Sequence, residues 1–389
     1  MYPNLYYAFK DLFGVEINGL KLVNSFGFFV AIAFMVSGWV LSKELQRKEQ
    51  EGIFGYTEQK IMVGGPVSLT DWLISFLLGF IFGYKFIGAF LLPDVLQDPP
   101  AYIFSLNGHL AAGIITGLVM IALKYRENKQ ERMPKPEARI IRIWPHDRVG
   151  DFILYAAAFG FLGAKIFHNL ENWNDFAKDP IGALLSFSGL TFYGGLICAT
   201  IAIIYYARKN KISVIHLADC MAPTMMLAYG LGRIGCQVSG DGDWGIENTK
   251  PNPFGFIPDW MWSYRYPHNV IGEGIPIEGC TGPYCMQLPQ PVYPTALYEI
   301  MMCLILFGVL WFFRKKITVP GRLAGLYLML NGAERFLIEK IRVNTHYTSL
   351  PFQPTQAQII SLLLIISGII LYTQSPRWFS KEKRPQTTI

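Results

Sequence analysis

Cysteine and histidine are scarce in this sequence, and their spacing disfavours a metal site. The chain of 389 residues contains six of each. Cys198, Cys220 and Cys303 lie in long apolar runs, where we expect them to be small packing residues. Cys280 and Cys285, in GCTGPYC, have no second close pair of ligands beside them, which disfavours zinc. For this pair the sequence leaves both a disulfide bond and two free thiols open.

A complete calcium-binding loop is absent as well. Asp241-Gly-Asp243 has the spacing that begins such a loop, but Gly245 stands at position five, and the required glycine and glutamate are out of register. Hydrogen bonding of this turn to a polyol or to neighbouring backbone is the favoured interpretation. We expect neither a metal nor another cofactor.

No cleavable signal peptide is evident, because Asp11 and Glu16 precede the first apolar run. Long apolar runs are abundant, however, and hydrophobic residues make up 52% of the chain. Runs of about 20 residues recur, each long enough to cross a hydrocarbon core of roughly 30 Å, and only helices satisfy their own backbone groups there. The sequence therefore predicts an all-α integral membrane protein, a polytopic bundle of about nine transmembrane helices. We expect these helices near residues 22–42, 71–92, 103–123, 149–170, 188–207, 215–237, 293–313, 323–341 and 357–373.

The basic residues indicate the topology. Most of the 34 lysines and arginines fall in one alternate set of loops between the apolar runs. The positive-inside rule places these loops in the cytoplasm, the N-terminus outside and the C-terminus inside. We therefore interpret the net charge of +6 as a sign of topology and not of nucleic-acid binding. Residues 238–292, rich in Pro, Gly and Trp, should form a small irregular head on the outer face.

Two stretches of the chain resemble each other and predict a duplicated helical hairpin. Residues 70–85 match 150–165, and residues 98–113 match 179–194. The alternative is that the two stretches became similar without duplication, because membrane helices share an apolar composition. The aligned identities include Asp71/Asp151, Gly83/Gly163 and Lys85/Lys165. The chain is then divided into an N-terminal arm with the first helix (1–70), an extra hairpin (71–148), core helices with a Gly-rich external loop (149–237), the head (238–292), and C-terminal helices with a basic tail (293–389).

An ionisable side chain at the centre of a membrane span costs about 2.5–3.5 kcal/mol to insert, so each one inside a span needs an explanation. Here they lie towards the outer ends of several predicted spans. Arg233 lies in the sixth span and Arg335 in the eighth. Two guanidiniums exceed what Glu339 alone neutralises, and their planar donors suit a phosphate. At the outer membrane boundary, the available phosphate is that of a phospholipid. Ion pairs between helices are the alternative, and we expect Lys340 and Arg342 to extend to the surface.

Four motifs follow one another along the chain: SGLTFYGGL, GRIGCQVSGDGDWG, YPTALYE and ERFLIEKIR. Together, over residues 150–345, they resemble the phosphatidylglycerol–prolipoprotein diacylglyceryl transferases of bacteria. The resemblance implies an inner-membrane enzyme with a core of about seven helices and a periplasmic head. It also implies transfer of diacylglycerol from phosphatidylglycerol to the thiol of a prolipoprotein's lipobox cysteine, with release of glycerol phosphate.

The resemblance assigns roles to individual residues. Arg233 corresponds to the essential arginine of the family signature and Arg335 to a second one. In the implied displacement, the substrate thiolate attacks a primary carbon of the lipid glycerol, and both arginines stabilise the leaving phosphate. The expected catalytic residues are Arg233, Arg335, Tyr193 and Glu339, and the expected substrate-binding residues are Arg233, Gly194, Gly195, Asp241, Asp243, Gly245, Tyr298, Glu299 and Arg342.

The sequence departs from the family pattern where a base for the thiol is expected. Tyr193 stands where the family often has histidine, so a histidine base at this position is excluded. A free thiol has a pKa of about 8.5 and needs a proton acceptor or a positive field. Tyr193, Glu339 or an aspartate of the Asp241–Asp243 turn are all candidates for that role.

Other departures concern the remaining motifs and the extra hairpin. Cys236 replaces the usual asparagine, and the Asp241/Asp243 turn, with one inserted residue, replaces a glutamate. Phe26-Gly27 replaces the family's Tyr-Gly of the first span. The extra hairpin 71–148 lies outside the resemblance and has Ala112 at the position equivalent to Tyr193. We therefore expect it to be scaffolding.

Two other classes of protein compete with the enzyme. Transporters place their sites near the midplane, between inverted repeats. The repeat here is parallel and the charges lie near one face, which favours an enzyme over an anion or lipid transporter. A non-catalytic phospholipid-binding scaffold stays open, because no complete catalytic set is evident in the sequence.

Overall fold

The computed structural model describes residues 1–92, 102, 105–132, 136–185, 191–344, 347 and 352–379. Parts of the predicted repeat (98–101, 103–104 and 186–190) and of the basic tail (380–389) lie outside the described residues. The chain divides into two compact units. Unit 1 comprises Met1–Gly55, Pro145–Ile153 and Ala207–Ile389, and unit 2 comprises Tyr56–Trp144 and Leu154–Tyr206.

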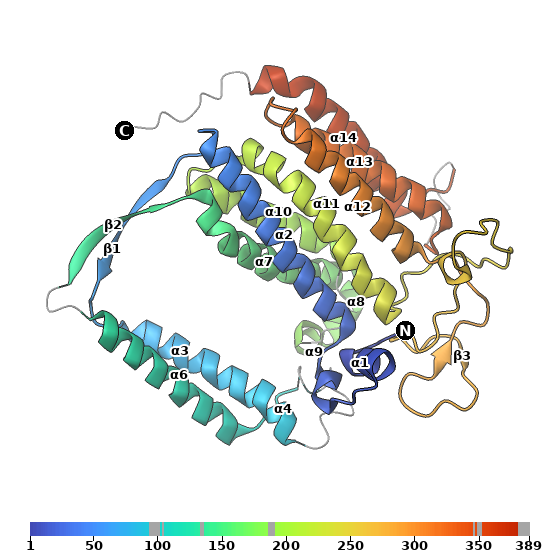
Figure 1. The fold of residues 1–389 in the computed structure, drawn as a ribbon, viewed down its shortest axis with the longest axis horizontal. Helices are drawn as coiled ribbons and strands as arrows, with labels where there is room; N and C mark the ends of the chain where they lie inside the picture. The colour runs from blue at the N-terminus through green and yellow to red at the C-terminus, as the bar shows by residue number, and fades with distance from the viewer. Residues whose placement is uncertain are drawn as a thin grey trace. The chain divides into compact units, whose positions relative to one another are not determined.

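Long helices that pack side by side form the body of unit 1. Helix α2 packs against α11, α11 against α12, and α13 against α14 (Figure 1). Their bounds are α2 Ser25–Gln50, α11 Val214–Ser239, α12 Thr295–Phe313, α13 Arg322–Ile338 and α14 Gln356–Trp378. The unit also contains α1 (Leu5–Phe13), the 3-10 turns η1 (Asn18–Leu22) and η4 (Pro145–Arg148), and the first residues of α7 (Val149–Glu171).

Small residues form the seam between α13 and α14. A Cβ atom added to Gly325 would lie 2.9 Å from the carbonyl oxygen of Gly368, and one added to Gly368 would lie 2.7 Å from that of Gly325. About two helical turns after Gly325, a Cβ at Gly332 would lie 2.6 Å from the carbonyl oxygen of Ser361. Close backbone approach through small residues is how membrane helices gain packing energy without a hydrophobic driving force.

The predicted helical membrane protein is confirmed at this level. Among the described residues, six helical segments are long and apolar enough to cross a membrane: Ser25–Gln50, Leu69–Leu91, Pro145–Glu171, Val214–Ser239, Thr295–Phe313 and Gln356–Trp378. Helices α6 (Leu110–Glu131), α10 (Phe192–Lys209) and α13 cover the other three predicted spans. The full set of nine crossings stays a prediction.

Unit 2 contains a β-ribbon that the sequence analysis missed. Strand β1 (Thr57–Val63) pairs antiparallel with β2 (Glu137–Ile143), with Thr57 opposite Ile143 and Val63 opposite Glu137. Between the two strands the chain forms α3 (Leu69–Ile81), a π-helical turn η2 (Phe82–Ile87), α4 (Gly88–Leu91) and α6. The ribbon therefore brings together the segments that precede α3 and follow α6. The rest of unit 2 is most of α7, α8 (Trp173–Lys178), α9 (Pro180–Leu185) and α10.

Glycines that align in the predicted repeat make close helix contacts in both hairpins of unit 2, and the duplication itself stays a prediction. A Cβ at Gly83 would lie 2.4 Å from the carbonyl oxygen of Ala112 on α6. A Cβ at Gly163, its counterpart in α7, would lie 2.5 Å from the carbonyl oxygen of Gly194 on α10. Lys85 donates to the carbonyl oxygens of Tyr102, at 3.0 Å, and of two further residues of the connecting segment, Ser105 and Asn107.

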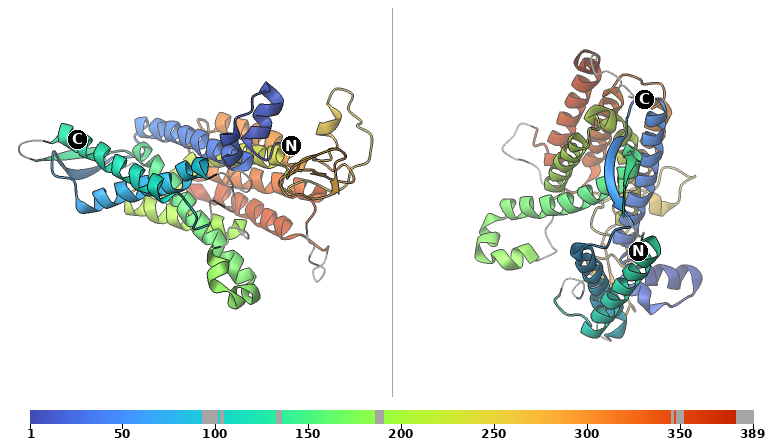
Figure 2. Two further views of the ribbon diagram at one scale, coloured as in Figure 1. Left: turned by 90° about the horizontal axis from the view of Figure 1, so that it is seen from below. Right: turned by 90° about the vertical axis from the view of Figure 1, so that its left-hand side faces the viewer.

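Between α11 and α12 the chain is mostly irregular, as the sequence predicts. Regular structure there is limited to η5 (Asp259–Met261) and the short pair β3 (Ile275–Pro276) and β4 (Met286–Gln287). Figure 2 shows this segment as a set of loops beyond the ends of the helices. Its core is a cluster of four buried side chains, Trp244, Tyr266, Leu288 and Val292.

Asp219, within α11, fixes the start of α13. Its buried carboxylate accepts hydrogen bonds from the backbone N–H groups of Gly321 (2.8 Å) and Ala324 (2.9 Å). Gly321 has a φ of 86°, a left-handed conformation that favours glycine. The carboxylate thereby satisfies two of the N–H groups that the beginning of a helix leaves without an acceptor.

Replacing Asp219 with alanine is expected to lower the free energy of unfolding by about 2–4 kcal/mol, because two buried N–H groups lose their acceptor. Asp219→Asn keeps one accepting oxygen, and we expect it to lose about half as much. Unfolding of the three proteins in detergent measures the difference. Equal stability of Asp219→Ala and the wild type would contradict the role of this cap.

Candidate active site

Glu299 is the centre of a buried cluster of charges. It lies in the first turns of α12, and its side chain is fully buried. Arg233 of α11 reaches it through Nε (2.8 Å to Oε2), and Arg335 of α13 through Nη1 (3.0 Å to Oε1). Arg342 lies 3.5 Å from Oε1, and the Tyr229 hydroxyl donates to the same oxygen at 3.0 Å. One carboxylate therefore holds three guanidiniums together.

Two further carboxylates complete the cluster. Asp243, in the turn after α11, pairs with both Arg233 and Arg342. Glu339 pairs with Arg335 (3.0 Å). Glu339 also accepts hydrogen bonds from Thr355 (2.7 Å) and from Asn344 (2.6 Å).

Two expectations about these charges were wrong. Glu339 alone was expected to neutralise Arg233 and Arg335, which left an excess of positive charge, but in the described network three arginines face three carboxylates. The reason is that Glu299 and Asp243 arrive from other segments of the chain. Arg342 was expected to extend to the surface, yet its side chain is only 10% exposed. Helix α13 ends at Ile338 and Arg342 has an extended backbone, which turns its side chain into the cluster instead.

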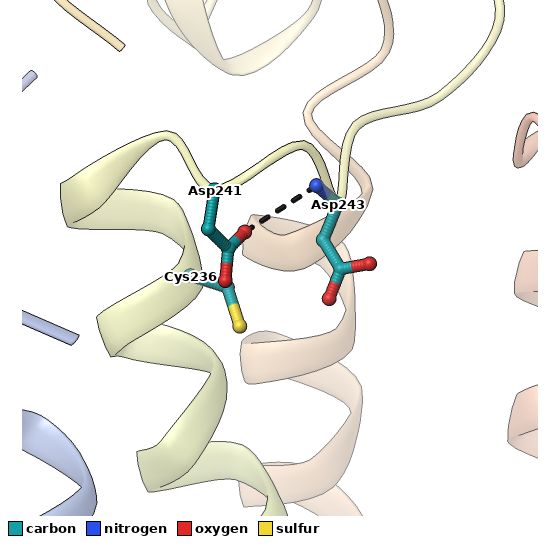
Figure 3. Close-up of side chains that lie close together, drawn as sticks. All are labelled: Cys236, Asp241 and Asp243. Carbon is teal, nitrogen blue, oxygen red and sulfur yellow. Dashed lines mark hydrogen bonds between the residues drawn. The ribbon is translucent and has the colours of Figure 1, made fainter. Parts of the chain in front are cut away.

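The end of α11 and the turn after it place the aspartates. Gly240 ends the helix in the left-handed conformation, with a φ of 64°. Figure 3 shows Cys236, Asp241 and Asp243 close together, and the Asp243 N–H donates to Asp241 Oδ1 (3.3 Å). Burial raises the pKa of Asp241. Burial also opposes the ionisation of Asp243, but Arg233 and Arg342 outweigh it and hold the pKa of that carboxyl below its usual range.

These three side chains also form a group whose potential metal-ligating atoms lie within 4.8 Å of one another. The electrostatics around them oppose a cation. Asp243 is already paired with two guanidiniums, and Arg233 also lies 3.8 Å from the Cys236 sulfur. A metal ion would face these positive charges directly. The arrangement suits an anion better than a cation.

Gly245 joins the head to the segment that carries Arg342. The two residues form a β-bridge, and Ile246 N–H donates to Ile341 O (2.8 Å). A Cβ on Gly245 would lie 2.4 Å from that same Ile341 oxygen, so no larger residue fits without displacement. Gly245 thus serves the site through backbone packing that positions Arg342.

Two side chains at the start of α12 also donate hydrogen bonds to the backbone of the segment that follows α11. Thr295 Oγ1 donates to the carbonyl oxygen of Asp243 (2.7 Å), and the Tyr298 hydroxyl donates to that of Met261 (2.9 Å). Tyr298 therefore lies beside the cluster with its hydroxyl bonded to the head. The structure gives it a positioning contact next to its neighbour Glu299.

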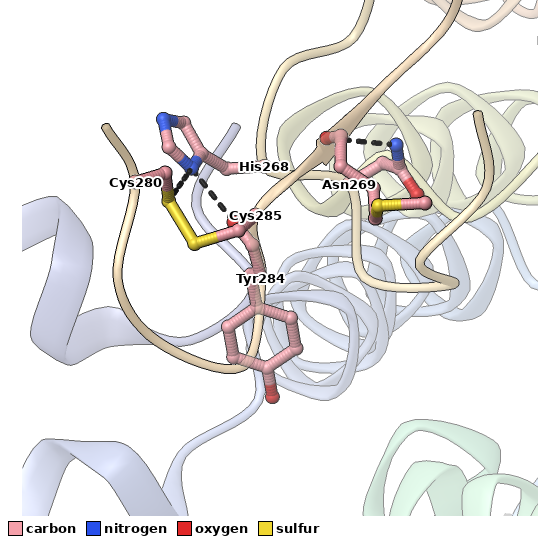
Figure 4. Close-up of a disulfide and its surroundings, with 6 residues drawn as sticks. His268, Asn269, Cys280, Tyr284 and Cys285 are labelled. Atoms are coloured by element: carbon pink, nitrogen blue, oxygen red, sulfur yellow. Dashed lines mark hydrogen bonds between the residues drawn. A yellow bond between two sulfur atoms is a disulfide. The ribbon is translucent and has the colours of Figure 1, made fainter. Parts of the chain in front are cut away.

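The head also contains the disulfide bond that the sequence left open. Cys280 and Cys285 are bonded, with their Cα atoms 5.6 Å apart (Figure 4). His268 Nδ1 donates to the carbonyl oxygen of Tyr284 (2.7 Å), inside the loop that the bond closes. The bond limits the conformations of this loop in the unfolded chain.

Tyr193, Gly194 and Gly195 belong to unit 2, at the start of α10. Tyr193 is half-buried. A Cβ on Gly194 would lie 2.3 Å from Cβ of Phe167, and one on Gly195 would lie 2.8 Å from Gly160 O. Helix packing against α7 thus explains both glycines, and a part in substrate binding stays a prediction for all three residues.

Phe26, a departure from the family pattern, and Glu334, a buried acid, both lie in unit 1. The Phe26 carbonyl oxygen lies 3.0 Å from where a Cβ of Gly235 would be, so the first turn of α2 contacts the arginine signature through backbone. Glu334 was missed, although an acidic residue inside an apolar span is itself a signal. It is buried, and neither carboxyl oxygen has a hydrogen-bond partner within the described part of the chain.

Glu299 and Glu334 offer a matched test of the cluster. Glu299→Gln is expected to lower the free energy of unfolding by about 3–5 kcal/mol, because the guanidiniums around it lose a buried counter-charge. Glu334→Gln keeps the shape of the buried side chain and removes no ion pair seen among the described residues, so we expect a smaller loss of about 1 kcal/mol. Unfolding in detergent measures both. Equal losses would show that the ion pairs of Glu299 contribute nothing beyond burial.

The chain is similar in sequence to known proteins. The sequence model of the prolipoprotein diacylglyceryl transferase family matches residues 109–374, more than half of the chain. A phosphatidylglycerol–prolipoprotein diacylglyceryl transferase of Dehalococcoides mccartyi is 29% identical over 234 residues, which cover 60% of this chain and 78% of that protein. Proteins of the same name from Aeromonas salmonicida (62% and 77% covered) and Shouchella clausii (60% and 77%) are each 28% identical.

The matched region corrects one expectation and shows the family. It begins at residue 109, so α6 lies inside the match, although the whole hairpin 71–148 was expected to lie outside. All the arginines and carboxylates of the cluster around Glu299 lie within the match. The chain belongs to the prolipoprotein diacylglyceryl transferase family.

Proposed function

We propose that this protein transfers the diacylglyceryl group of phosphatidylglycerol to the lipobox cysteine thiol of prolipoproteins and releases glycerol phosphate. The observation that carries the proposal is the arginine cluster built around Glu299. Arg233, Arg335 and Arg342 are held by carboxylates, and Arg233 and Arg335 keep 15% and 21% of their side-chain surface exposed. The names of the relatives support the two substrates.

The reaction places its main demand on the leaving group. An alkyl phosphate leaves a carbon atom slowly unless its growing negative charge is stabilised. Guanidiniums fixed in advance inside a low-dielectric site supply that stabilisation without having to reorganise. The pairs of Arg233 and Arg335 with Glu299 fix their orientation, which is the pre-organisation the chemistry requires.

The proposed setting is the bacterial inner membrane, crossed nine times. The positive-inside rule places the N-terminus and the head on the periplasmic side and the C-terminus in the cytoplasm. Arg233 precedes the head by a few residues, so the cluster would open to the outer leaflet. Phosphatidylglycerol and the lipobox of an exported prolipoprotein both reach that level.

Release of glycerol phosphate from phosphatidylglycerol and a lipobox peptide tests the proposal. Arg233→Ala is expected to lower kcat by about 10²–10³-fold, because it removes a donor to the leaving phosphate. Arg265→Ala removes an exposed arginine of the head, and we expect activity to change by about twofold or less. A peptide with serine in place of cysteine should give no release.

Two results would contradict this function. One is release that does not need the peptide thiol, which indicates a hydrolase. The other is folded wild-type protein that binds phosphatidylglycerol without any release, which indicates a scaffold.

A further inference from the structure

Asp243 closes the outward side of the arginine cluster. Its two carboxylate oxygens pair with different guanidiniums, Oδ2 with Arg233 and Oδ1 with Arg342. Glu299 holds the same two arginines from within. The Asp243 side chain is 31% exposed, whereas those of Glu299 and Glu339 are fully buried. Of the carboxylates paired with these arginines in the described part of the chain, Asp243 alone is within reach of a ligand.

The position of this carboxylate is also a position for a phosphate. A carboxylate that bridges two guanidiniums presents two oxygens and one negative charge, and so does a phosphodiester. The network is balanced while Asp243 is in place. A phosphodiester that entered without displacing Asp243 would leave one uncompensated negative charge among partly buried groups, which is costly. The two anions are therefore alternatives for the same donors.

The backbone around Asp243 is anchored, so a phosphate would displace the carboxylate by rotation of the side chain alone. Thr295 Oγ1 donates to its carbonyl oxygen, and the next residue, Trp244, packs in the buried cluster of the head. Gly245 N–H donates to Tyr293 O (2.9 Å). A change of rotamer about χ1 moves the carboxylate off the arginines and leaves the turn in place.

We propose that Asp243 holds the place of the lipid phosphate in the resting protein and, once displaced by it, acts as the base for the substrate thiol. The inference rests on the proposed function of this site. The other acidic candidates are less suited. Arg335, Thr355 and Asn344 already engage the oxygens of Glu339, and Asp241 has no part in the ion pairs that the described residues make with these arginines.

Displacement from the arginines makes the Asp243 carboxylate a stronger base, as proton transfer from the thiol requires. Arg233 and Arg342 keep the pKa of Asp243 low despite its burial, so losing them raises that pKa and makes the group a better proton acceptor. Asp243 then takes the proton of the cysteine S–H group. The thiolate sulfur bonds to the glycerol carbon, the C–O bond breaks, and its electron pair leaves on the oxygen of glycerol phosphate. Asp243 finally returns the proton to water.

Asp243→Asn separates the two roles, since the amide neither competes with phosphate nor accepts the thiol proton. We expect phosphatidylglycerol in nanodiscs to bind about tenfold more tightly, as for a site whose competent state is about one-tenth populated in the wild type. We expect kcat to fall by about 10²–10³-fold through loss of the base. Asp243→Ala carries the same expectation and guards against a folding defect confined to asparagine.

Asp259→Asn is the matched control. Asp259 is exposed in the head, and its contact with Asn252 Nδ2 (3.1 Å) survives the change. The affinity of Asp259→Asn for phosphatidylglycerol and its kcat should stay within about twofold of the wild-type values. Weaker binding, or an unchanged kcat, in the folded Asp243 variants overturns the inference while wild-type turnover still supports the proposed function. If the wild type gives no thiol-dependent release, the proposed function fails, and tighter binding to the variants still tests the exchange.

Discussion

A single buried carboxylate, that of Glu299, determines how the rest of the site is arranged. Guanidiniums at the end of a membrane span are tolerated only when a counter-charge is buried with them. Arg233 and Arg335 come from α11 and α13, and Arg342 follows the 3-10 turn η6 (Glu339–Ile341); all three meet Glu299 on α12. The cluster therefore fixes separate parts of the chain relative to one another, with planar donors already oriented before any ligand binds.

The head extends this arrangement from the helices to the loops. Gly245 pairs with the backbone of Arg342, and Thr295 holds the carbonyl group of Asp243. Residues far apart in the sequence thus depend on one another, because a shift of the head would move both an arginine and its carboxylate. Gly235 and Gly245 of the signature act through close backbone contact, which explains why small residues accompany the charged ones there. Rigid support of this kind is what an electrostatic site needs to stabilise a transition state.

The sequence predicted the helices and most members of the cluster, but not how they pair. Apolar run length indicates a span, and a helical period places Arg335 and Glu339 on one face. Neither tells which faces of different helices meet, so the neutralising role of Glu299 and Asp243 was missed and a charge excess was wrongly inferred. The end of α13 at Ile338, which redirects Arg342, was also missed. The pairing of β1 with β2 was missed because a ribbon depends on contacts between distant segments.

An experimental structure of the protein in nanodiscs with bound phosphatidylglycerol tests the central claim most directly. The account predicts phosphate oxygens about 3 Å from guanidinium nitrogens of Arg233 and its neighbours, with Glu299 still beneath them and Asp243 turned away. A lipid phosphate bound elsewhere, with Asp243 still between Arg233 and Arg342, would contradict it.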